Sequence, residues 1–189
     1  ARAGASVQTR HRHALVTAGV TAQLVVDPEA PTGTVICLVD AADGAERTFL
    51  TDSGASLRLT PADWSPSALD GIARLHLSGY LLFSSSGRAL VRTAVAAARA
   101  RGVPVSLDPA SAGFLQELGA SRFVSLVDGV DVLLPSRAES RLLTGLTDDL
   151  DAAAELSRTF PLVVAKQGED GALIAQDGAV RARIPAVPV

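Results

Sequence analysis

Two kinds of hydrophobic pattern alternate along this chain. Short runs rich in valine, leucine and isoleucine are separated by longer stretches whose apolar residues recur at helical spacing. The run Leu75–Phe83 predicts a buried strand, and the stretch from about Arg88 to Arg101 predicts a helix that Ser84–Ser86 cap and Gly102 ends. A further strand at Pro104–Leu107 completes a βαβ unit, which we expect to be right-handed.

The same alternation continues to the end of the chain, with no linker, repeat or low-complexity segment. Helices are predicted near Ala112–Leu118, Phe123–Val127, Ala138–Leu143 and Leu150–Thr159, with strands at Val130–Leu134 and Leu162–Ala165 and a hairpin over Ala172–Ile184. Strands that alternate with helices are typical of a mostly parallel sheet covered by helices. The pattern therefore predicts an α/β fold.

The first part of the chain departs from this order. No element is assigned to the first 13 residues; a short helix is expected at His13–Ala18 and a strand at Ala22–Val26. Two strand-like runs, Thr34–Val39 and Glu46–Thr51, then flank the turn-forming sequence Asp40-Ala-Ala-Asp-Gly44. We expect a hairpin here, as an addition to the parallel sheet.

Composition narrows the class of protein. A length of 189 residues with 48% hydrophobic content can bury a core of about one domain. The net charge of −3 offers no basic surface to a phosphate backbone, so we expect no nucleic-acid partner, and we interpret Arg10–His13 as a solvated segment. No apolar stretch is long enough for a membrane span or a secretory signal, which predicts a cytoplasmic protein without a membrane partner.

Sulfur-containing residues are almost absent. The single cysteine, Cys37, excludes an intramolecular disulfide, which fits a reducing cytoplasm, and its place in the run VICLV predicts a small buried apolar residue. The chain contains no methionine, even at position 1. We interpret it as a fragment or a truncated gene product.

Candidate chemistry lies at the carboxyl ends of the predicted strands, where open α/β sheets bind their ligands. Glu139, in the segment Pro135-Ser-Arg-Ala-Glu139, begins a helix and is ordinarily a capping or helix-dipole residue. The segment Lys166-Gln-Gly-Glu-Asp-Gly171 follows the next strand, and its glycines alone indicate only a turn. Asp108 is open to two interpretations: it orients a turn at Pro109, or it lies near a phosphate path.

Other motifs for catalysis or cofactor binding are not found. His76 lies in an alternating strand pattern and is interpreted as structural. The serines form no assignable triad with histidine and aspartate, and there is no G-x-G-x-x-G or Walker A sequence. A hydrolase, a dinucleotide enzyme and a P-loop protein are therefore disfavoured.

The segments 131–145, DVLLPSRAESRLLTG, and 162–174, LVVAKQGEDGALI, together resemble the nucleotide side of ribokinase-like carbohydrate kinases, the PfkB family. The resemblance implies a three-layer α/β/α fold with a mostly parallel sheet and a small β lid. It also implies transfer of the γ-phosphoryl group of ATP to a sugar hydroxyl, assisted by Mg²⁺.

Family motifs imply roles for individual residues. In the N-x-x-E pattern Glu139 would act on magnesium indirectly, through water or phosphate, and Ser136 stands where asparagine is usual, which weakens the contact with metal or phosphate. In the T/K-x-G-x-x-G pattern, Lys166, Gly168 and Gly171 would contact the phosphates or ribose of the nucleotide.

The resemblance extends upstream into a lid segment and the sugar side. Its pieces are Pro31-Thr-Gly-Thr34, Asp43-Gly44, Glu46-Arg-Thr48, Ser53-Gly-Ala-Ser56 with GAS in place of GAN, Leu75-His-Leu-Ser-Gly79, and Leu107-Asp-Pro109 followed by Ala110 in place of asparagine. The implied substrate and lid residues are Gly33, Thr34, Arg47, Gly79 and Asp108. Such lids often mediate dimerisation, so the partners implied are a sugar, ATP and a second copy of the chain.

The resemblance covers residues 27–184 and is incomplete at both ends. We assign residues 1–26 to an N-terminal remnant and residues 27–189 to an incomplete kinase core with a lid at about 31–56. The family's catalytic aspartate, in its GAGD motif, has no match here, and neither has its N-terminal sugar-binding aspartate with a glycine pair. No catalytic residue is assigned and turnover near background is expected; the alternative is a non-catalytic module that binds a ligand or pairs through its lid.

Overall fold

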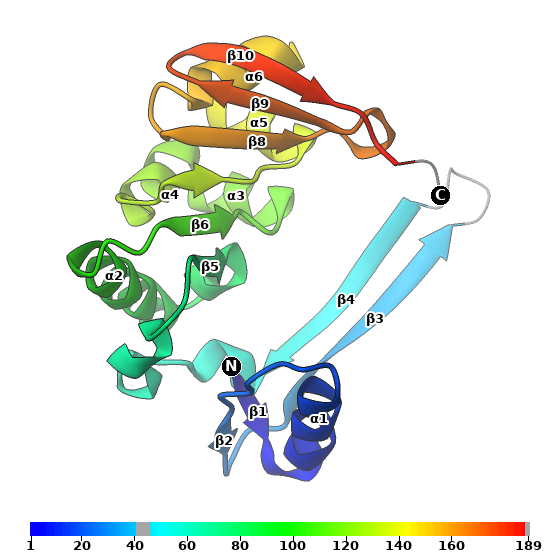
Figure 1. Ribbon diagram of the computed structural model, residues 1–189. Helices are drawn as coiled ribbons and strands as arrows, with labels where there is room; N and C mark the ends of the chain where they lie inside the picture. Colours follow the sequence, from blue (N-terminus) through cyan, green and yellow to red (C-terminus); the bar gives the residue numbers. More distant parts are fainter. Residues whose placement is uncertain (41–45, 188–189) are drawn as a thin grey trace. The chain divides into compact units, whose positions relative to one another are not determined.

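The computed structural model describes residues 1–40 and 46–187 of the chain. These residues form two compact units, Ala1–Asp63 and Trp64–Val189. In Figure 1 the first unit runs from blue to cyan and the second from green to red. The boundary expected near residue 26 lies inside the first unit.

The first unit contains two small sheets and one α-helix. Strands β1 and β2 pair in parallel, and β3 pairs antiparallel with β4 to form the expected hairpin. The elements are β1 (Arg2–Gly4), α1 (Ala5–Thr17), β2 (Val25–Asp27), β3 (Thr32–Asp40), β4 (Glu46–Gly54) and two 3₁₀ turns, η1 (Ala55–Arg58) and η2 (Pro61–Asp63). The expected turn at residues 41–45, which includes Asp43-Gly44, lies outside the described residues.

Helix α1 corrects the interpretation of the first residues. It occupies most of the segment for which the sequence predicts no element, so the short helix expected from His13 is only its last part. From residue 9 to residue 17 all its side chains are exposed except Leu15, which is partly buried. A helix without an apolar stripe shows no 3.6-residue period in its sequence, which explains why the pattern missed it.

The β3–β4 hairpin has apolar side chains on both faces. Cys37 lies opposite Phe49 and Ile36 opposite Leu50 in the ladder, and alternate residues of a strand point to opposite faces. Each of these large apolar side chains is at least 50% exposed: Val35, Ile36, Leu38, Val39, Phe49 and Leu50. Cys37 is exposed too, so its expected burial is wrong. A VICLV run resembles a central strand, but here it belongs to a two-stranded ladder.

A buried carboxylate holds the base of this unit together. Asp27, at the end of β2, is 1% exposed and accepts hydrogen bonds from the backbone N–H groups of Glu29 and Ala30, each at 2.9 Å. It also pairs with Arg2 Nε at 2.8 Å and Arg58 Nε at 3.1 Å. The backbone bonds from Ala30 and Glu29, assisted by the two arginines, lower the pKa of Asp27 to about 2 from its ordinary 3.8.

We expect acid to destabilise the first unit through Asp27. Because the folded pKa is depressed, the contribution of Asp27 is fully present above about pH 4 and is lost as the pH falls toward 2. Thermal unfolding of Asp27→Asn should show a lower midpoint at pH 7 and a weaker dependence on pH below 4 than the wild type. Glu29→Gln removes only the exposed Glu29–Arg58 pair and is the matched control. Equal acid sensitivity in Asp27→Asn and the wild type would contradict this account.

The second unit is built on one six-stranded sheet with the order β10-β9-β8-β7-β6-β5. Strands β5 to β8 are parallel, and β9 and β10 continue the sheet antiparallel. The strands are β5 (Leu75–Ser78), β6 (Val105–Asp108), β7 (Val132–Leu133), β8 (Leu162–Lys166), β9 (Ala172–Gln176) and β10 (Ala179–Ile184). The predicted α/β fold with a mostly parallel sheet is therefore confirmed.

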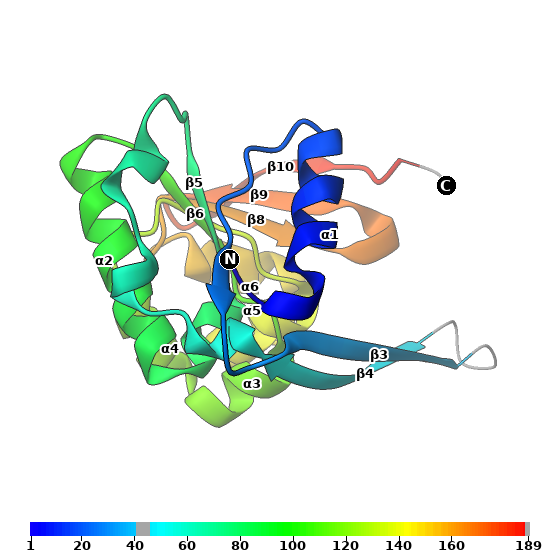
Figure 2. The same ribbon diagram turned by 90° about the horizontal axis from the view of Figure 1, so that it is seen from below.

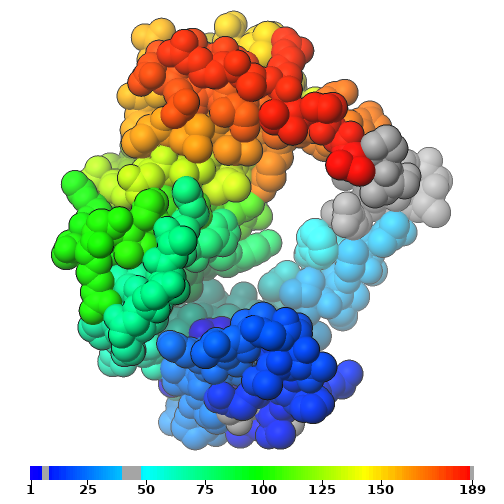
Figure 3. All heavy atoms as spheres, viewed as in Figure 1, coloured from blue at the N-terminus to red at the C-terminus, as the bar shows by residue number. Residues whose placement is uncertain are grey.

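The helices of this unit follow one another along the sheet. They are α2 (Ser85–Ala100), α3 (Ala112–Leu118), α4 (Ala120–Leu126), α5 (Arg137–Thr144) and α6 (Asp149–Leu156), with 3₁₀ turns η3 (Pro66–Leu69), η4 (Gly79–Phe83) and η5 (Gly168–Asp170). Each parallel strand lies next to its predecessor, so right-handed crossovers keep these helices on the same side of the sheet, as Figure 2 shows. The space-filling view shows the unit as one continuous body (Figure 3).

The core lies between this helical layer and the sheet. Its fully buried side chains come from α2, from the central strands and from α4, and include Val91, Val105, Leu107, Phe123, Leu133 and Val163. In the part of the chain that the structure describes, no helix is both long and apolar enough to cross a membrane.

One predicted strand of this unit is wrong in its extent. The strand expected over Leu75–Phe83 is β5 for four residues and then a 3₁₀ turn, and only Leu77 of the four is buried. The change occurs at Gly79, where a Cβ atom would lie 2.2 Å from the carbonyl oxygen of Pro109. The end of β5 thus packs directly on the turn after β6, and apolar composition alone does not reveal this bend. Helix α3 is confirmed at its predicted bounds.

Candidate functional site at the carboxyl edge of the sheet

The ends of three parallel strands bring predicted site residues together. Lys166 Nζ, at the end of β8, forms an ion pair with Asp108 Oδ2, at the end of β6. Between them, Ser136 follows β7 and forms a β-bridge with Lys166, whose N–H donates to the carbonyl oxygen of Pro135 at 2.8 Å. Residues more than 50 positions apart in the chain meet because parallel strands share a carboxyl edge.

Asp108 uses both oxygens of its carboxylate. Oδ1 accepts a hydrogen bond from the N–H of Ala110 at 3.0 Å, while Oδ2 pairs with Lys166. The first contact orients the turn at Pro109, which was one of its two interpretations. It also holds Ala110 at a φ of 82°, a conformation that asparagine tolerates better than alanine. This gives a physical reason for asparagine at the third position of a D-P-N element.

The start of α5 is a capping box. Ser136 is the N-cap and its Oγ accepts from Glu139 N at 3.3 Å, while Glu139 Oε2 accepts from Ser136 N at 2.7 Å. Glu139 is 5% exposed. The ordinary capping role is therefore present, yet the other carboxylate oxygen of Glu139 has no hydrogen-bond partner among the described residues.

The glycines after β8 form a tight turn. Gln167 N donates to Gly171 O at 2.7 Å, and Gly171 N donates back to Gly168 O at 3.0 Å. Both glycines have positive φ, 63° at Gly168 and 90° at Gly171. A Cβ atom on Gly171 would lie 1.9 Å from the carbonyl oxygen of Ile184, whereas one on Gly168 would meet no atom within 4 Å. The two positions therefore need glycine to different degrees.

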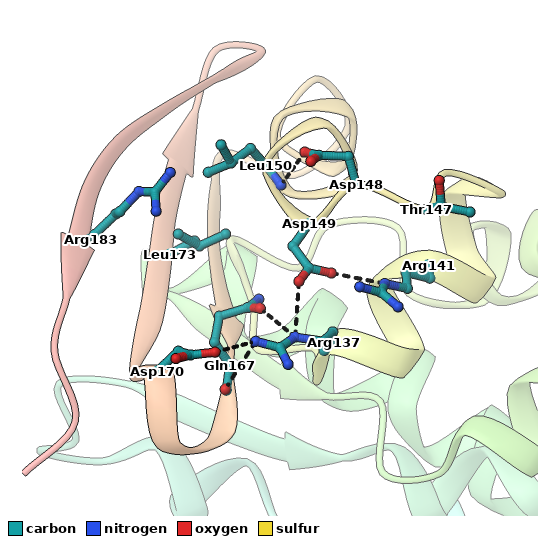
Figure 4. Close-up of a pocket in the computed structure, with 10 residues that line it drawn as sticks. All are labelled: Arg137, Arg141, Thr147, Asp148, Asp149, Leu150, Gln167, Asp170, Leu173 and Arg183. Atoms are coloured by element: carbon teal, nitrogen blue, oxygen red, sulfur yellow. Dashed lines mark hydrogen bonds and ion pairs between the residues drawn. The ribbon is translucent and has the colours of Figure 1, made fainter.

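Arginine side chains beside this turn form a network that the sequence did not indicate. Arg137 Nε lies 2.9 Å from both Asp149 Oδ2 and Gln167 Oε1, and its Nη2 lies 2.7 Å from Asp170 Oδ2 (Figure 4). The hydrogen bond with Asp170 and the charge of Asp149 raise the pKa of Arg137. Arg141 Nε also pairs with Asp149, at 2.9 Å.

This network borders a groove of about 550 Å³ between α5, the start of α6, the turn after β8 and the strands β9 and β10. The groove is lined by Arg137, Arg141, Thr147, Asp148, Asp149, Leu150, Gln167, Asp170, Leu173 and Arg183 (Figure 4). Its charged side chains are three arginines and three aspartates, so their formal charges cancel. The groove is therefore not an anion site by charge alone.

The other candidates are divided between the two units. Gly79 lies against the Asp108 turn, but Gly33 and Thr34 lie on β3 of the first unit, and Arg47 falls in β4 opposite Val39. Gly33 allows close pairing in the hairpin, since a Cβ there would lie 2.7 Å from the carbonyl oxygen of Ser53. No group of three or more metal-binding side chains occurs among residues 1–40 and 46–187.

His76 has the structural role that its strand pattern predicts. Its Nδ1 lies 3.0 Å from Ser106 Oγ, and the two residues face each other in the β5–β6 ladder. Nδ1 of the imidazole thus has a cross-strand partner on the sheet.

This chain belongs to the pfkB family of carbohydrate kinases, because the model of that family matches residues 2–189. The bifunctional protein HldE of Caulobacter vibrioides is 31% identical over 174 residues, which are 86% of this chain and 31% of HldE. The chain therefore spans about a third of this curated relative.

Solved structures show the same fold. All of this chain superposes on 57% of adenosine kinase from Sinorhizobium meliloti, with a TM-score of 0.86 and 22% identity. It also covers 61% of a putative ribokinase II from E. coli in complex with ATP and Mg²⁺, with a TM-score of 0.82 and 23% identity. The predicted family and the ribokinase-like α/β fold are confirmed.

Proposed function

We propose that this chain is the central portion of an ATP-dependent sugar kinase, which transfers the γ-phosphoryl group to a sugar hydroxyl. The observation that supports it best is the assembly at the carboxyl edge. Three features adjoin one another there: a cationic strand end at Lys166, the glycine turn that follows it, and the start of α5 at Ser136. Phosphoryl transfer depends on such positioning and on donors that neutralise phosphate charge.

The nucleotide side is assigned to Ser136, Lys166, Gly168 and Gly171. Lys166 is 44% exposed and would exchange its partner Asp108 for a phosphate oxygen. The glycines let the backbone approach the phosphates or ribose without side chains in between. In this proposal Asp108 keeps the positive charge of Lys166 paired until the nucleotide binds.

Magnesium would be bound chiefly through the nucleotide. Mg²⁺ is ordinarily bound by one or two carboxylates together with substrate phosphates and water. Glu139 fits that requirement, because one carboxylate oxygen is committed to the capping box and the other is not. When bound, the ion would neutralise charge on the phosphates; the part of Glu139 is to accept a hydrogen bond from a water that lies beside the ion and the phosphates.

Within the second unit, Gly79 and Asp108 are assigned to the acceptor side. Gly33, Thr34 and Arg47 of the hairpin are assigned to the lid by the family resemblance alone. None of these residues is proposed as the base that accepts the hydroxyl proton. Turnover by the 189 residues alone should accordingly stay near background. A location in the cytoplasm, where ATP is available, is part of the same proposal.

The test is a titration of the ¹⁵N-labelled chain with a non-hydrolysable ATP analogue and Mg²⁺, followed by NMR. We expect saturable shifts of the amide signals of Gly168 and Gly171, with much smaller shifts in α3. Saturable binding that shifts signals only elsewhere, or no binding at millimolar analogue, would reject the nucleotide-side assignment. In that event the non-catalytic alternative gains support.

A second candidate function is pairing of two copies through the β3–β4 hairpin. Six large apolar side chains at least half exposed, on both faces of a two-stranded ladder, favour it. Such a ladder is marginal in water unless one of its faces is covered. Sedimentation equilibrium of the wild type and of Phe49→Asp tests this. A dimer that the substitution dissociates supports pairing, and a wild-type monomer at 100 μM (about a hundredfold above a micromolar dissociation constant) rejects it.

A further inference from the structure

Arg137 joins three segments that meet beside the proposed nucleotide site. It is the first residue of α5, and it contacts Asp149 at the start of α6 and both Gln167 and Asp170 in the turn after β8. Its Nη2 also donates to the backbone carbonyl of Gln167 at 3.3 Å. One guanidinium thus holds two helix starts and a glycine turn in a fixed relation.

The contacts of Arg137 lie next to the site residues in the chain. Arg137 follows Ser136 directly, and Gln167 follows Lys166 directly. The Arg137–Gln167 hydrogen bond, at 2.9 Å, therefore runs alongside the Ser136–Lys166 bridge. Gln167 is 6% exposed, so this bond is better shielded from water than an ordinary surface contact.

We propose that Arg137 is the positioning residue of the nucleotide site, which fixes the Gly168–Gly171 turn against the start of α5. The proposal rests on the proposed function, because it explains how the assigned residues keep their geometry. Arg137 acts through Gln167 and Asp170. Its Nε and Nη2 donors are occupied by protein, and the role proposed here uses only these contacts.

The planar fork of arginine is essential to this role. Nε and Nη2 diverge toward different partners at a fixed angle, which a lysine ammonium cannot reproduce. The pairs with Asp149 and Asp170 are individually weak because Arg137 is 42% exposed. The contribution of the guanidinium is geometric. Once its side chain is ordered, the same group fixes α5, the start of α6 and the turn after β8 relative to one another.

Arg141 offers a matched control on the same helix. It lies one turn further along α5 and pairs with the same Asp149, but it contacts neither Gln167 nor Asp170. Arg141→Gln therefore removes one positive charge and one contact to α6 without touching the turn. Asp170→Asn does the converse: it weakens the contact to the turn and leaves the Arg137–Asp149 pair in place.

The experiment measures analogue affinity and amide hydrogen exchange in the wild type and in four variants: Arg137→Gln, Arg137→Lys, Arg141→Gln and Asp170→Asn. We expect Arg137→Gln to weaken binding about tenfold, as loss of a supporting contact shell typically does, and Arg141→Gln to stay within about twofold. Arg137→Lys should recover little of the loss. The amides of Gln167 and Gly171, which close the turn, should exchange about tenfold faster in Arg137→Gln than in Arg141→Gln.

Each result decides the proposal. Wild-type affinity in Arg137→Lys would show that the positive charge alone matters. Equal losses of affinity in Arg137→Gln and Arg141→Gln would show that the contacts of Arg137 with the turn have no special role. Either result overturns the proposal. If the wild type binds no analogue, the proposed function fails, and the exchange rates alone then decide whether Arg137 fixes the turn. Should Arg137→Gln not fold, Asp170→Asn answers the same question: wild-type affinity and exchange there would overturn the proposal.

Discussion

Replacing Gly171 with alanine is expected to disrupt the strands after β8 and to lower the free energy of unfolding by about 3 to 5 kcal/mol. Two causes act at this position. The added Cβ atom would lie 1.9 Å from the carbonyl oxygen of Ile184, so backbone must move. The φ and ψ angles of 90° and −122° also lie in a region that essentially only glycine occupies. Chemical denaturation followed by circular dichroism measures the loss.

Gly168→Ala is the matched control for this prediction. The position also has a positive φ, 63°, but there is open space around the missing Cβ atom. Its cost should be about 1 kcal/mol, which is the ordinary penalty for alanine at a positive φ without a steric clash. Equal losses for the two variants would contradict the close approach between Gly171 and Ile184. A large loss of stability only in Gly171→Ala would show that Gly171 is required for the fold, whereas Gly168 is not.

Lys166→Met is expected to weaken binding of the ATP analogue by about 10- to 100-fold, because a hydrogen bond to a charged group contributes about 1.5 to 3 kcal/mol. Stability should change little, since the partner Asp108 is 33% exposed and can be hydrated. Isothermal titration calorimetry at two salt concentrations measures the effect. The variant should also show a weaker dependence of affinity on salt. Unchanged affinity would remove Lys166 from the nucleotide side.

Asp108→Asn should act in the opposite direction. An asparagine Oδ1 can still accept the hydrogen bond from Ala110 N, so the turn at Pro109 is kept. The substitution removes the negative charge that competes with phosphate for Lys166, and about threefold tighter binding is expected from the loss of that competition. Weaker binding would place Asp108 in direct contact with the nucleotide or its metal, the second of its two interpretations.

The second unit could be predicted from the sequence because its helices have apolar stripes and its strands have apolar runs. Helix α3 has its predicted bounds, and Ser84 caps α2 through its Oγ as expected. The failures occur where local pattern and tertiary context diverge. Helix α1 has no apolar stripe, and β5 ends at Gly79 because of a contact with Pro109, a residue of another strand end.

The same distinction applies to the site. The resemblance predicts roles for Ser136, Glu139 and Lys166 because each belongs to a short motif. The pair between Lys166 and Asp108 required the strand order, since the two residues are 58 positions apart. Arg137 was not identified because its role depends on Gln167, 30 positions away, and no local pattern marks it.

The capping role of Ser136 has a consequence for how this site can evolve. Serine and asparagine are nearly equal as N-caps, so α5 starts equally well with either. Exchange between the two residues changes the hydrogen-bonding groups of the side chain while leaving the helix intact. Evolution can therefore change the chemistry of this strand end by a single substitution that leaves the stability of the protein almost unchanged. A serine and an asparagine variant at position 136 should both be folded.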